Sequence, residues 1–506
     1  MSTYQKLFLI ILAFTGLLLI MGLNTHLYFG DEVIHYRFAK DIYQEGRRVA
    51  VNPVYERQGR FGYFNVYEPL WHFGLALVWK CIGKISFIAA QIYHSFYYAL
   101  LILLTFILGK LLYDERIGLV SSFVIATIPM FVSFSMLFYL DVPAAVFVVL
   151  FFILFFKEKY FLAGITLGIL YLTKRNACFF IPAIPLLIIF KHKKYFLKIF
   201  KIMFFLFIPL IIIFIWDLIW RKNNIGSLFV APAESIASSL KYVKDITIEK
   251  MALKKIMVTN EAITSKKFNI RAIQNSILIN PIDLIKYFGI GFWIIFSSYF
   301  INKTYKKKDL WLWVPGIIFI VFFLYFFKLK ADVRYLMPII PLLIIIISQG
   351  FVSIKKDFIK KIIIGLCIMQ ILSSGIYIYS KRQISMEEKE AFRYIKENIP
   401  DKQLIMYPGP IILEETEKIA VWGAFYLLPY FFWGTENDMK KIIEINKLRY
   451  VAIKNAKIYD DAQEKHLGGY PRSFVEKLSS LDFIKCIYKN NAISIWQIDR
   501  NLTKSK

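Results

Sequence analysis

Two adjacent acids, Asp31 and Glu32, stand where the first hydrophobic segment of the chain gives way to polar sequence. The preceding run, at about residues 7–27, is apolar, and Gly30 separates it from the acids. Carboxylates next to hydrocarbon are costly, and proteins usually retain them there for a task. Such a carboxylate can accept the proton of an attacking hydroxyl or amine. The alternative is an acidic first turn of a solvated helix, which the helix dipole favours.

Further acids and bases recur near the ends of later apolar runs. They are Glu68, Asp141, Lys174, Arg175 and Arg334. Lysine and arginine can hold a phosphate, with arginine giving bidentate contacts. Phosphate is a good leaving group once cations neutralise its charge. These residue types together predict transfer of a group from a phosphate-bearing donor, with a carboxylate as the proton acceptor.

Helical spacing distinguishes the two acids of the first pair. His35 would lie one turn beyond Asp31 on the same helix face, so we predict Asp31 as the base and an orienting role for Glu32. His35 could equally be a packing or hydrogen-bonding group. No histidine or cysteine spacing predicts a metal site or another cofactor. The acids Asp31, Glu32 and Asp141 could instead hold a divalent cation, since hard cations take carboxylates.

Composition indicates what kind of protein positions these residues. The chain has 506 residues, of which 58% are hydrophobic and 18% aromatic, whereas soluble proteins are about 45–50% apolar. This composition is typical of a polytopic membrane protein. The net charge of +27 comes largely from lysines in short loops, so it indicates membrane topology and attraction to anionic lipid or phosphate, not nucleic acid. The four cysteines lack the spacing of a disulfide framework.

Apolar runs long enough to cross a membrane, which takes about 20 residues, recur about eleven times along the chain. They lie at about residues 7–27, 86–109, 117–138, 142–156, 160–173, 177–190, 199–219, 284–301, 310–327, 335–350 and 361–379. We interpret the first run as a retained signal-anchor helix, because no small-residue cleavage site follows it. A shorter stretch at about 69–79 suits an interfacial helix.

Lysine-rich loops fix the predicted orientation. With a cytoplasmic N-terminus, three lysine clusters fall on the cytoplasmic side, as the positive-inside rule requires. The clusters are Lys191, Lys193, Lys194, Lys198 and Lys201; Lys303, Lys306, Lys307 and Lys308; and Lys355, Lys356, Lys360 and Lys361. All the candidate site residues then fall on the other side of the membrane. Lys328, Lys330 and Asp332 lie there too, where the lysines are expected to snorkel to the interface.

The predicted fold is a polytopic α-helical membrane protein of about eleven transmembrane helices with a small C-terminal α/β domain outside the cytoplasm. Residues 1–380 form the membrane module, with outer loops at about 28–85 and 221–283, and residues 381–506 form the domain. Within the domain, short apolar runs at 404–406, 450–453 and 492–498 alternate with a helix-like stretch at 387–398. Such alternation predicts strands and amphipathic helices.

Four motifs make the chain resemble the GT-C superfamily of membrane glycosyltransferases, above all the protein O-mannosyltransferase and aminoarabinose-transferase-like branch (glycosyltransferase family 39 and its relatives). The motifs are the acidic pair in Gly30-Asp31-Glu32, the Asp-x-Pro of Asp141-Val142-Pro143, the Gly-to-Lys pattern of Gly168 to Lys174, and Arg334-Tyr335-Leu336-Met337-Pro338. An outer C-terminal domain also fits many bacterial members. The resemblance covers most of the chain in layout.

The resemblance implies a polyprenyl-phosphate-sugar donor and transfer that inverts the anomeric centre. Asp31 would be the catalytic base, with Glu32 beside it, and Lys174, Arg175 and Arg334 would bind the donor phosphate. Other substrate-binding positions would be His35, Glu68, Asp141 and Tyr335. Two departures leave the donor sugar and the acceptor open. Arg175 stands where many relatives have a small residue, and residues 67–70 match the family's proline-rich stretch only loosely.

The sequence therefore predicts a multi-pass cell-membrane glycosyltransferase. It would move a sugar from a polyprenyl-phosphate carrier to a lipid, glycan or protein acceptor on the extracytoplasmic face, in contact with membrane lipids. The alternative is a transporter or flippase for a polyprenyl-linked or anionic lipid. The lack of an internal repeat and the position of the charges at one membrane surface count against transport. A third reading is a glycan-binding or assembly factor with a decayed active site.

Overall fold

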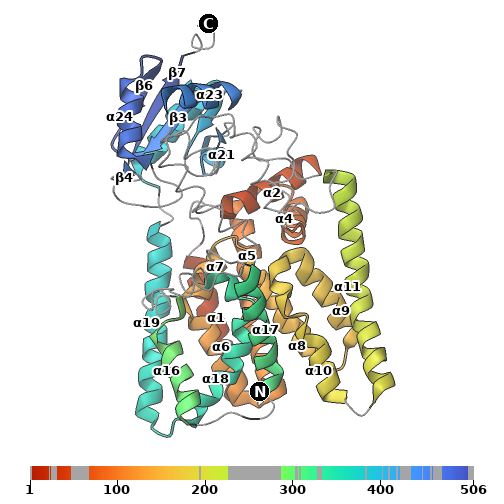
Figure 1. Cartoon of the computed structure of the whole chain (residues 1–506). Coiled ribbons are helices and arrows are strands. Elements are labelled where there is room, and N and C mark those ends of the chain that lie inside the picture. The colour runs from red at the N-terminus through yellow and green to blue at the C-terminus, as the bar shows by residue number, and fades with distance from the viewer. Residues whose placement is uncertain are drawn as a thin grey trace.

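In the computed structural model, a bundle of helices carries a small mixed α/β domain at one end (Figure 1). The structure describes residues 3–21, 23, 31–46, 68–192, 195–225, 287–302, 306, 309–326, 333–381, 384–401, 403–407, 411–416, 420–421, 435–446, 448–455, 458–459 and 470–499. The bundle helices are α1 (Thr3–Met21), α5 (Phe87–Leu112), α6 (Glu115–Thr127), α7 (Pro129–Met136), α8 (Asp141–Phe156), α9 (Tyr160–Thr173), α10 (Ala183–His192), α11 (Phe196–Ile225), α16 (Ile290–Ile301), α17 (Leu310–Phe326), α18 (Ile340–Ser353) and α19 (Asp357–Lys381).

Apolar helices of membrane-spanning length make this a multi-pass membrane protein. Among the described residues, three helical segments have the length and hydropathy to cross a membrane: Phe87–Leu112, Arg175–His192 and Phe196–Ile219. A fourth span is possible if α6 and α7, which meet at a 61° bend, are counted as one. Several other apolar helices, α8 and α9 among them, are shorter. The eleven transmembrane helices expected from the sequence therefore remain a prediction.

Glycines set how closely neighbouring bundle helices pack. Gly164 and Gly168 lie one turn apart on α9, facing α11. A Cβ at Gly164 would stand 2.2 Å from the backbone oxygen of Leu206, and one at Gly168 would stand 2.2 Å from Cδ1 of Ile213. Small residues at this spacing let helix backbones approach closely in membranes. The close approach of α9 to α11 brings together Tyr171 of α9 and Asp217 of α11.

Two shorter helices lie at the end of the bundle that carries the domain. They are α2 (Asp31–Glu45) and α4 (Leu70–Ile82). Helix α4 buries Trp71, Leu75 and Trp79 on one face and leaves Leu77 61% exposed on another. This amphipathic 13-residue helix confirms the helix predicted at about 69–79. It ends at Gly83, whose φ of 75° gives the left-handed cap that glycine favours.

The C-terminal domain is built on a five-stranded mixed sheet in the order β2-β1-β3-β7-β6. The strands are β1 (Leu404–Met406), β2 (Ala420–Val421), β3 (Leu448–Lys454), β6 (Ile484–Lys489) and β7 (Ile493–Ile498). Strand β1 runs parallel to β2 and β3, whereas β7 is antiparallel to both β3 and β6. A separate parallel pair is formed by β4 (Ile458–Tyr459) and β5 (Tyr470–Pro471). The predicted strands at 404–406, 450–453 and 492–498 all lie in this sheet.

Helices cover both faces of the sheet. Successive residues of a strand point to opposite faces, so neighbouring residues of β3 pack against different helices. Val451 and Ile453 of β3 pack against α23 (Glu436–Asn446) and α24 (Arg472–Ser480). Tyr450 and Ala452 belong instead to a cluster with residues of α20 (Met386–Asn398) and α21 (Ile411–Thr416). That second cluster also contains Ile34 and Phe38 of α2, so the membrane module contributes to a core of the domain.

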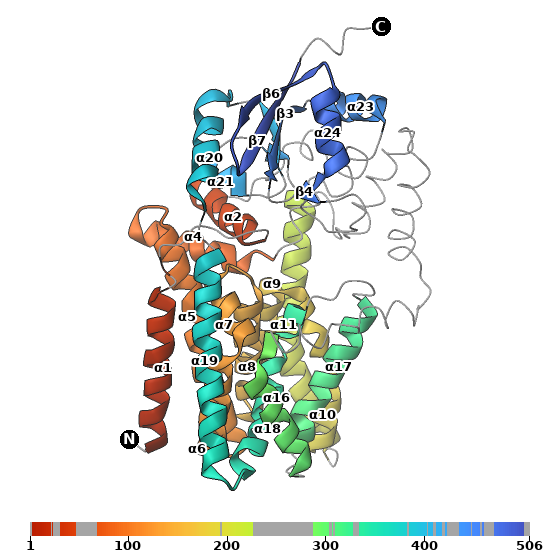
Figure 2. The same ribbon diagram turned by 90° about the vertical axis from the view of Figure 1, so that its left-hand side faces the viewer.

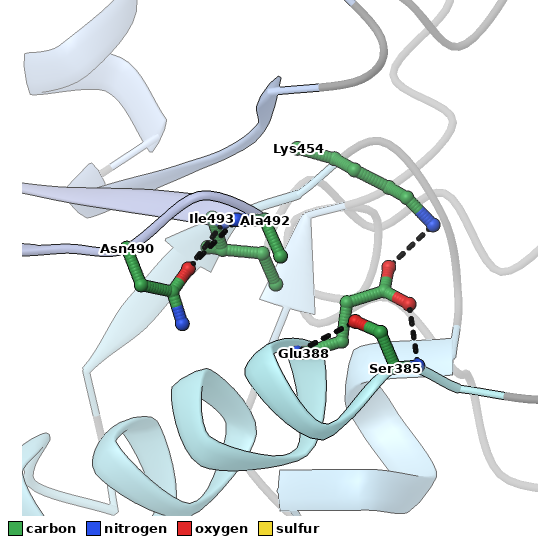
Figure 3. A network of polar contacts seen from close by, with 6 residues as sticks. All are labelled: Ser385, Glu388, Lys454, Asn490, Ala492 and Ile493. Atoms are coloured by element: carbon green, nitrogen blue, oxygen red, sulfur yellow. Dashed lines mark hydrogen bonds and ion pairs between the residues drawn. The ribbon is translucent and has the colours of Figure 1, made fainter.

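A polar network joins α20, the first helix after the last bundle helix α19, to the sheet (Figure 3). Ser385 and Glu388 form a capping box at the start of α20, and the Glu388 carboxylate also pairs with Lys454 of β3. The Asn490 side chain accepts hydrogen bonds from the backbone N–H groups of Ala492 and Ile493 and donates one of 2.7 Å to the Glu387 carbonyl. The network therefore fixes α20 against the sheet of the domain.

Candidate active site

A buried ion pair joins the start of α8 to the end of α9. Nζ of Lys174 lies 2.5 Å from Oδ1 of Asp141, and the two side chains are 13% and 0% exposed. Asp141 is in the first turn of α8, where the helix dipole favours a negative charge. Lys174 follows α9 in extended conformation, which turns its side chain toward α8. Oδ2 of Asp141 is buried and has no hydrogen-bond partner among the described residues.

Cations and aromatic rings alternate beside this pair. Lys174 Nζ lies 4.9 Å from the ring centre of Tyr335, and the Arg334 guanidinium lies 5.0 Å from the same ring. Arg334 is also 4.6 Å from the ring centre of Tyr139. Cations are attracted to the faces of such rings. Arg334 and Tyr335 belong to the short helix η4 (Val333–Leu336) just before α18. The stack thus brings a residue of the late motif next to Asp141 and Lys174.

Arg175 sits between two buried acids. It begins the short helix η2 (Arg175–Phe180); its Nε is 3.2 Å from Oε1 of Glu68, and its Nη2 is 3.7 Å from Oδ2 of Asp217. Tyr171 donates a 2.9 Å hydrogen bond to the same oxygen of Asp217. Nε and Nη2 of Arg175 are buried, and the described residues give them no hydrogen bond of good geometry. These N–H groups can therefore donate to an added oxyanion.

Glu68 lies in the segment just before α4, where it is 7% exposed. Burial raises the pKa of Glu68 above its ordinary value, and the nearby positive charge of Arg175 opposes that rise only in part. The carboxyl group therefore holds its proton to a higher pH than a solvated glutamate would. Its protonation state in turn controls how strongly Arg175 is attracted to it.

Sequence analysis missed Asp217, although a signal for it exists. It is 1% exposed and lies within the apolar helix α11, and an ionisable residue inside a membrane helix marks a functional site by default. Close packing of α11 on α9 at Gly164 and Gly168 brings Asp217 to Tyr171 and Arg175. Tyr139 and Tyr171 were also missed, because their roles depend on partners distant in the sequence.

The first acidic motif leads into helix α2, as predicted for a helix that begins at Asp31. Glu32 is fully buried and His35 is 2% exposed. Nδ1 of His35 lies 2.8 Å from Nε2 of His72 on α4, so the two imidazoles share a hydrogen bond. The side chain of Asp31 lies outside the part of the structure that can be described. His72, four residues after Glu68, is a partner that sequence analysis did not identify.

The structure thus brings together Asp141, Lys174, Arg175, Glu68, Arg334 and Tyr335, from segments spread over some 270 residues of the chain. It pairs His35 with His72 separately, at the adjoining end of α4. Lys328, Lys330 and Asp332 lie outside the described residues, as does most of the predicted loop at 221–283. Within the described side chains, no group of three or more His, Cys, Asp or Glu residues could hold a metal ion.

A further buried acid, Asp309, lies just before α17 at the other end of the bundle. Tyr113 and Gln349 donate hydrogen bonds to its Oδ1, and Tyr299 and the backbone N–H of Lys306 donate to its Oδ2. Both oxygens are therefore satisfied, whereas Asp141 has a hydrogen-bond partner among the described residues only at its Oδ1. Such a fully bonded buried acid ties helix ends together, and its role here is structural.

No known protein family and no curated protein matches this sequence. Solved structures do match. ArnT from Cupriavidus metallidurans, bound to undecaprenyl phosphate, aligns over 98% of both chains with a TM-score of 0.62 and 9% identity. An Archaeoglobus fulgidus oligosaccharyltransferase, tethered to an acceptor peptide, aligns over 90% of this chain and 69% of its own, with a TM-score of 0.59 and 14% identity. The mycobacterial arabinofuranosyltransferase AftD aligns over 98% of this chain and 42% of its own, with a TM-score of 0.50 and 10% identity. These are GT-C glycosyltransferases, and the protein described here has their fold.

Proposed function

From the GT-C fold we propose that this protein is an integral-membrane glycosyltransferase. It transfers a sugar from a polyprenyl-phosphate-sugar donor to a lipid, glycan or protein acceptor on the non-cytoplasmic face. The observation that carries the proposal is a group of three neighbouring cations: Lys174, which pairs with Asp141, Arg334 on the same Tyr335 ring, and Arg175 next in the chain, which pairs with Glu68. A fold of this type is compatible with such a donor, since ArnT of the same fold was solved with undecaprenyl phosphate.

In the proposed reaction, the three cations hold the donor phosphate. The buried N–H groups of Arg175 that lack hydrogen bonds of good geometry are the best placed to receive its oxygens. Lys174 would divide its charge between Asp141 and the phosphate. As the bond from the anomeric carbon to the phosphate oxygen breaks, charge grows on the phosphate, and fixed cations in a low-dielectric site stabilise it.

Asp31 is proposed as the base. An acceptor hydroxyl or amine attacks the anomeric carbon from the face opposite the leaving phosphate, its proton passes to the carboxylate, and the configuration inverts. General-base catalysis of this kind contributes about 10²–10⁴-fold in rate. Glu32 and His35, buried on the same helix, would orient that acid. Glu68 and Asp217 would hold Arg175 in place rather than touch the acceptor.

The lysine clusters support the proposed sidedness. Lys191 and Lys198, at the loop between α10 and α11, lie at the end of α10 opposite η2, which carries Arg175. Because lysine-rich loops stay on the cytoplasmic side, the end of the bundle with Arg175 would face the other compartment. The C-terminal domain lies at that same end (Figure 2).

The test is turnover of a labelled polyprenyl-phosphate-sugar by purified protein carrying D31N or K174A. D31N is expected to lower kcat by about 10²-fold or more, because the base is lost. K174A is expected to raise the donor KM, because a phosphate contact is lost. K110A is the matched control, since Lys110 lies at the far end of α5 and pairs only with Glu115 among the described residues. Full turnover by both site variants would disprove the assigned roles, and transport of the donor without its consumption would favour a flippase.

A further inference from the structure

Helix α2, which begins at Asp31, lies between the membrane bundle and the C-terminal domain. Both ribbon views show it below α21 and above α4, and Figure 2 also shows α20 above it (Figures 1 and 2). It is a short amphipathic helix of 15 residues, so its orientation depends on what it packs against. Two separate apolar cores hold it, and His35 adds a hydrogen bond to His72.

The side of α2 toward the domain carries Ile34 and Phe38, which are 4% and 1% exposed. These two residues are one turn apart, and they belong to one cluster with Ile412 of α21 and Ile495 of β7. They therefore complete the core on one face of the domain's sheet. The core on the other face of that sheet, which includes Phe474, contains no residue of α2.

The opposite side of α2 packs on the end of the bundle. Val33, Tyr36 and Ala39 form a cluster with Trp79 of α4 and with Phe138. The Tyr36 ring centre is 5.3 Å from that of Trp79 and 6.0 Å from that of Phe138. Residues three apart share a helix face, so this set lies away from Ile34 and Phe38.

Both supports lead directly to the candidate site. Phe138 is three residues before Asp141, so α2 packs on the segment that leads into the Asp141–Lys174 pair. His72, which shares a hydrogen bond with His35, also packs edge-on against Phe38 at 5.5 Å. It is one helical turn from Glu68, which contacts Arg175. A shift of α2 would thus change the position of its first residue relative to the cations.

We infer that the C-terminal domain is a positioning part of the active site: through Ile34 and Phe38 it fixes helix α2, and so the acid at its start. The inference rests on the proposed function, because it takes Asp31 as the proton acceptor. Interlocked apolar side chains fix the rotation and height of a helix, since cores are packed as closely as crystals. Displacing a catalytic group by about 1 Å can cost about 10² in rate. The phosphate-binding cations lie on other elements, so donor binding does not depend on this contact.

Two variants weaken the contact from its two sides, and each has a matched control on the far face of the sheet. F38L acts on α2 and is paired with F474L in α24; I412A acts on α21 and is paired with I453A in β3. All four side chains are fully or almost fully buried. We expect F38L and I412A to lower kcat by about tenfold to 10²-fold, with the donor KM within twofold of wild type. The controls should keep kcat within about twofold, measured well below each variant's unfolding temperature.

An equal loss of kcat in all four variants would mean that the domain contributes stability alone, and no loss in F38L and I412A would mean that α2 needs no support. Either result overturns the inference.

Amide hydrogen exchange of residues 31–45 gives a second measurement that needs no activity. Protection of α2 should fall in F38L and I412A and stay in F474L and I453A. If the wild-type protein consumes no donor but this exchange pattern holds, the proposed function fails while the positioning of α2 by the domain stands. Unchanged protection in all four variants overturns the positioning itself.

Discussion

Lys174 has two partners of different kinds, the carboxylate of Asp141 and the ring of Tyr335. The carboxylate balances the charge of Lys174 in a buried place and accepts one of its three N–H donors, whereas the ring face attracts the cation without being a strong hydrogen-bond acceptor. The same division recurs at Arg175, which has two acids at ion-pair distance and yet keeps N–H groups that make no good hydrogen bond. At the residue scale, acids thus balance the charges of Lys174 and Arg175, while some N–H groups of these cations still lack a good hydrogen bond among the described residues.

The pair predicts a distinctive phenotype for D141N. Removing the carboxylate leaves Lys174 buried without its partner, which we expect to cost about 3–5 kcal/mol of unfolding free energy, as breaking other buried pairs does. A bound polyprenyl phosphate would replace the lost negative charge. The rise in unfolding temperature on adding polyprenyl phosphate should therefore be larger in D141N than in wild type. An equal or smaller rise would show that Lys174 does not receive the phosphate.

Part of the site could be predicted from residue types alone, because acids and bases at the ends of apolar runs are conspicuous. Lys174 and Asp141 were singled out in this way, and the structure brings them into contact. Asp217 was overlooked because a single acid inside an apolar run has no local partner, and its partner Tyr171 is 46 residues away. His72 was overlooked for the same reason. Which polar residues meet is decided by helix packing, which one sequence does not encode locally.

At the scale of elements, the close approach of α9 and α11 positions Asp217 against Arg175. The two glycines at this contact are not equivalent. A side chain at Gly164 would meet the backbone of Leu206, whereas one at Gly168 would meet the mobile end of the Ile213 side chain. Backbone cannot move aside without shifting the helix, but a methyl group can rotate away.

We therefore expect G164A to be more harmful than G168A. Overpacking of this kind typically costs about 1–3 kcal/mol, and the upper end should apply to G164A and the lower end to G168A. Thermal unfolding in detergent measures the order of stability, and donor turnover should follow it, because α11 carries Asp217. Equal effects of the two substitutions would contradict the helix contact as described.

Elements were predictable where local sequence decides them. The strands at β1, β3 and β7 and the helix α20 fall close to the predicted ranges, because short apolar runs and an amphipathic helical pattern are local signals. The broken pair α6–α7 was predicted as a single run at 117–138. Pro129 at the start of α7 lacks the backbone N–H needed to continue the helix. Hydropathy alone does not register that break.

At the scale of the whole molecule, polar contacts attach α20, the first helix of the C-terminal domain, to the sheet of that domain (Figure 3). Among the described residues, the Asn490 side chain makes four hydrogen bonds, two as acceptor and two as donor, whereas the side chain of its neighbour Asn491 makes one, to the Glu387 carboxylate. A net hydrogen bond contributes about 0.5–1.5 kcal/mol. N490A should therefore lower the unfolding free energy of the domain by about 2–4 kcal/mol, and N491A by about 1 kcal/mol at most. Chemical denaturation followed by tryptophan fluorescence compares them, and a similar loss in both would contradict the network.

Helix α2 and the sheet that covers it are separated by almost the whole chain. During synthesis, Ile34 and Phe38 emerge early, whereas strand β7, which shares their core, comes at residues 493–498. At about 5–20 residues per second, the ribosome needs roughly half a minute or more to bridge that interval. Throughout this period the apolar side of α2 has no domain to cover it. A nascent chain would therefore lack the packing that holds α2, and under the proposed function and the proposed role of the domain, transfer would begin only after the domain has been translated.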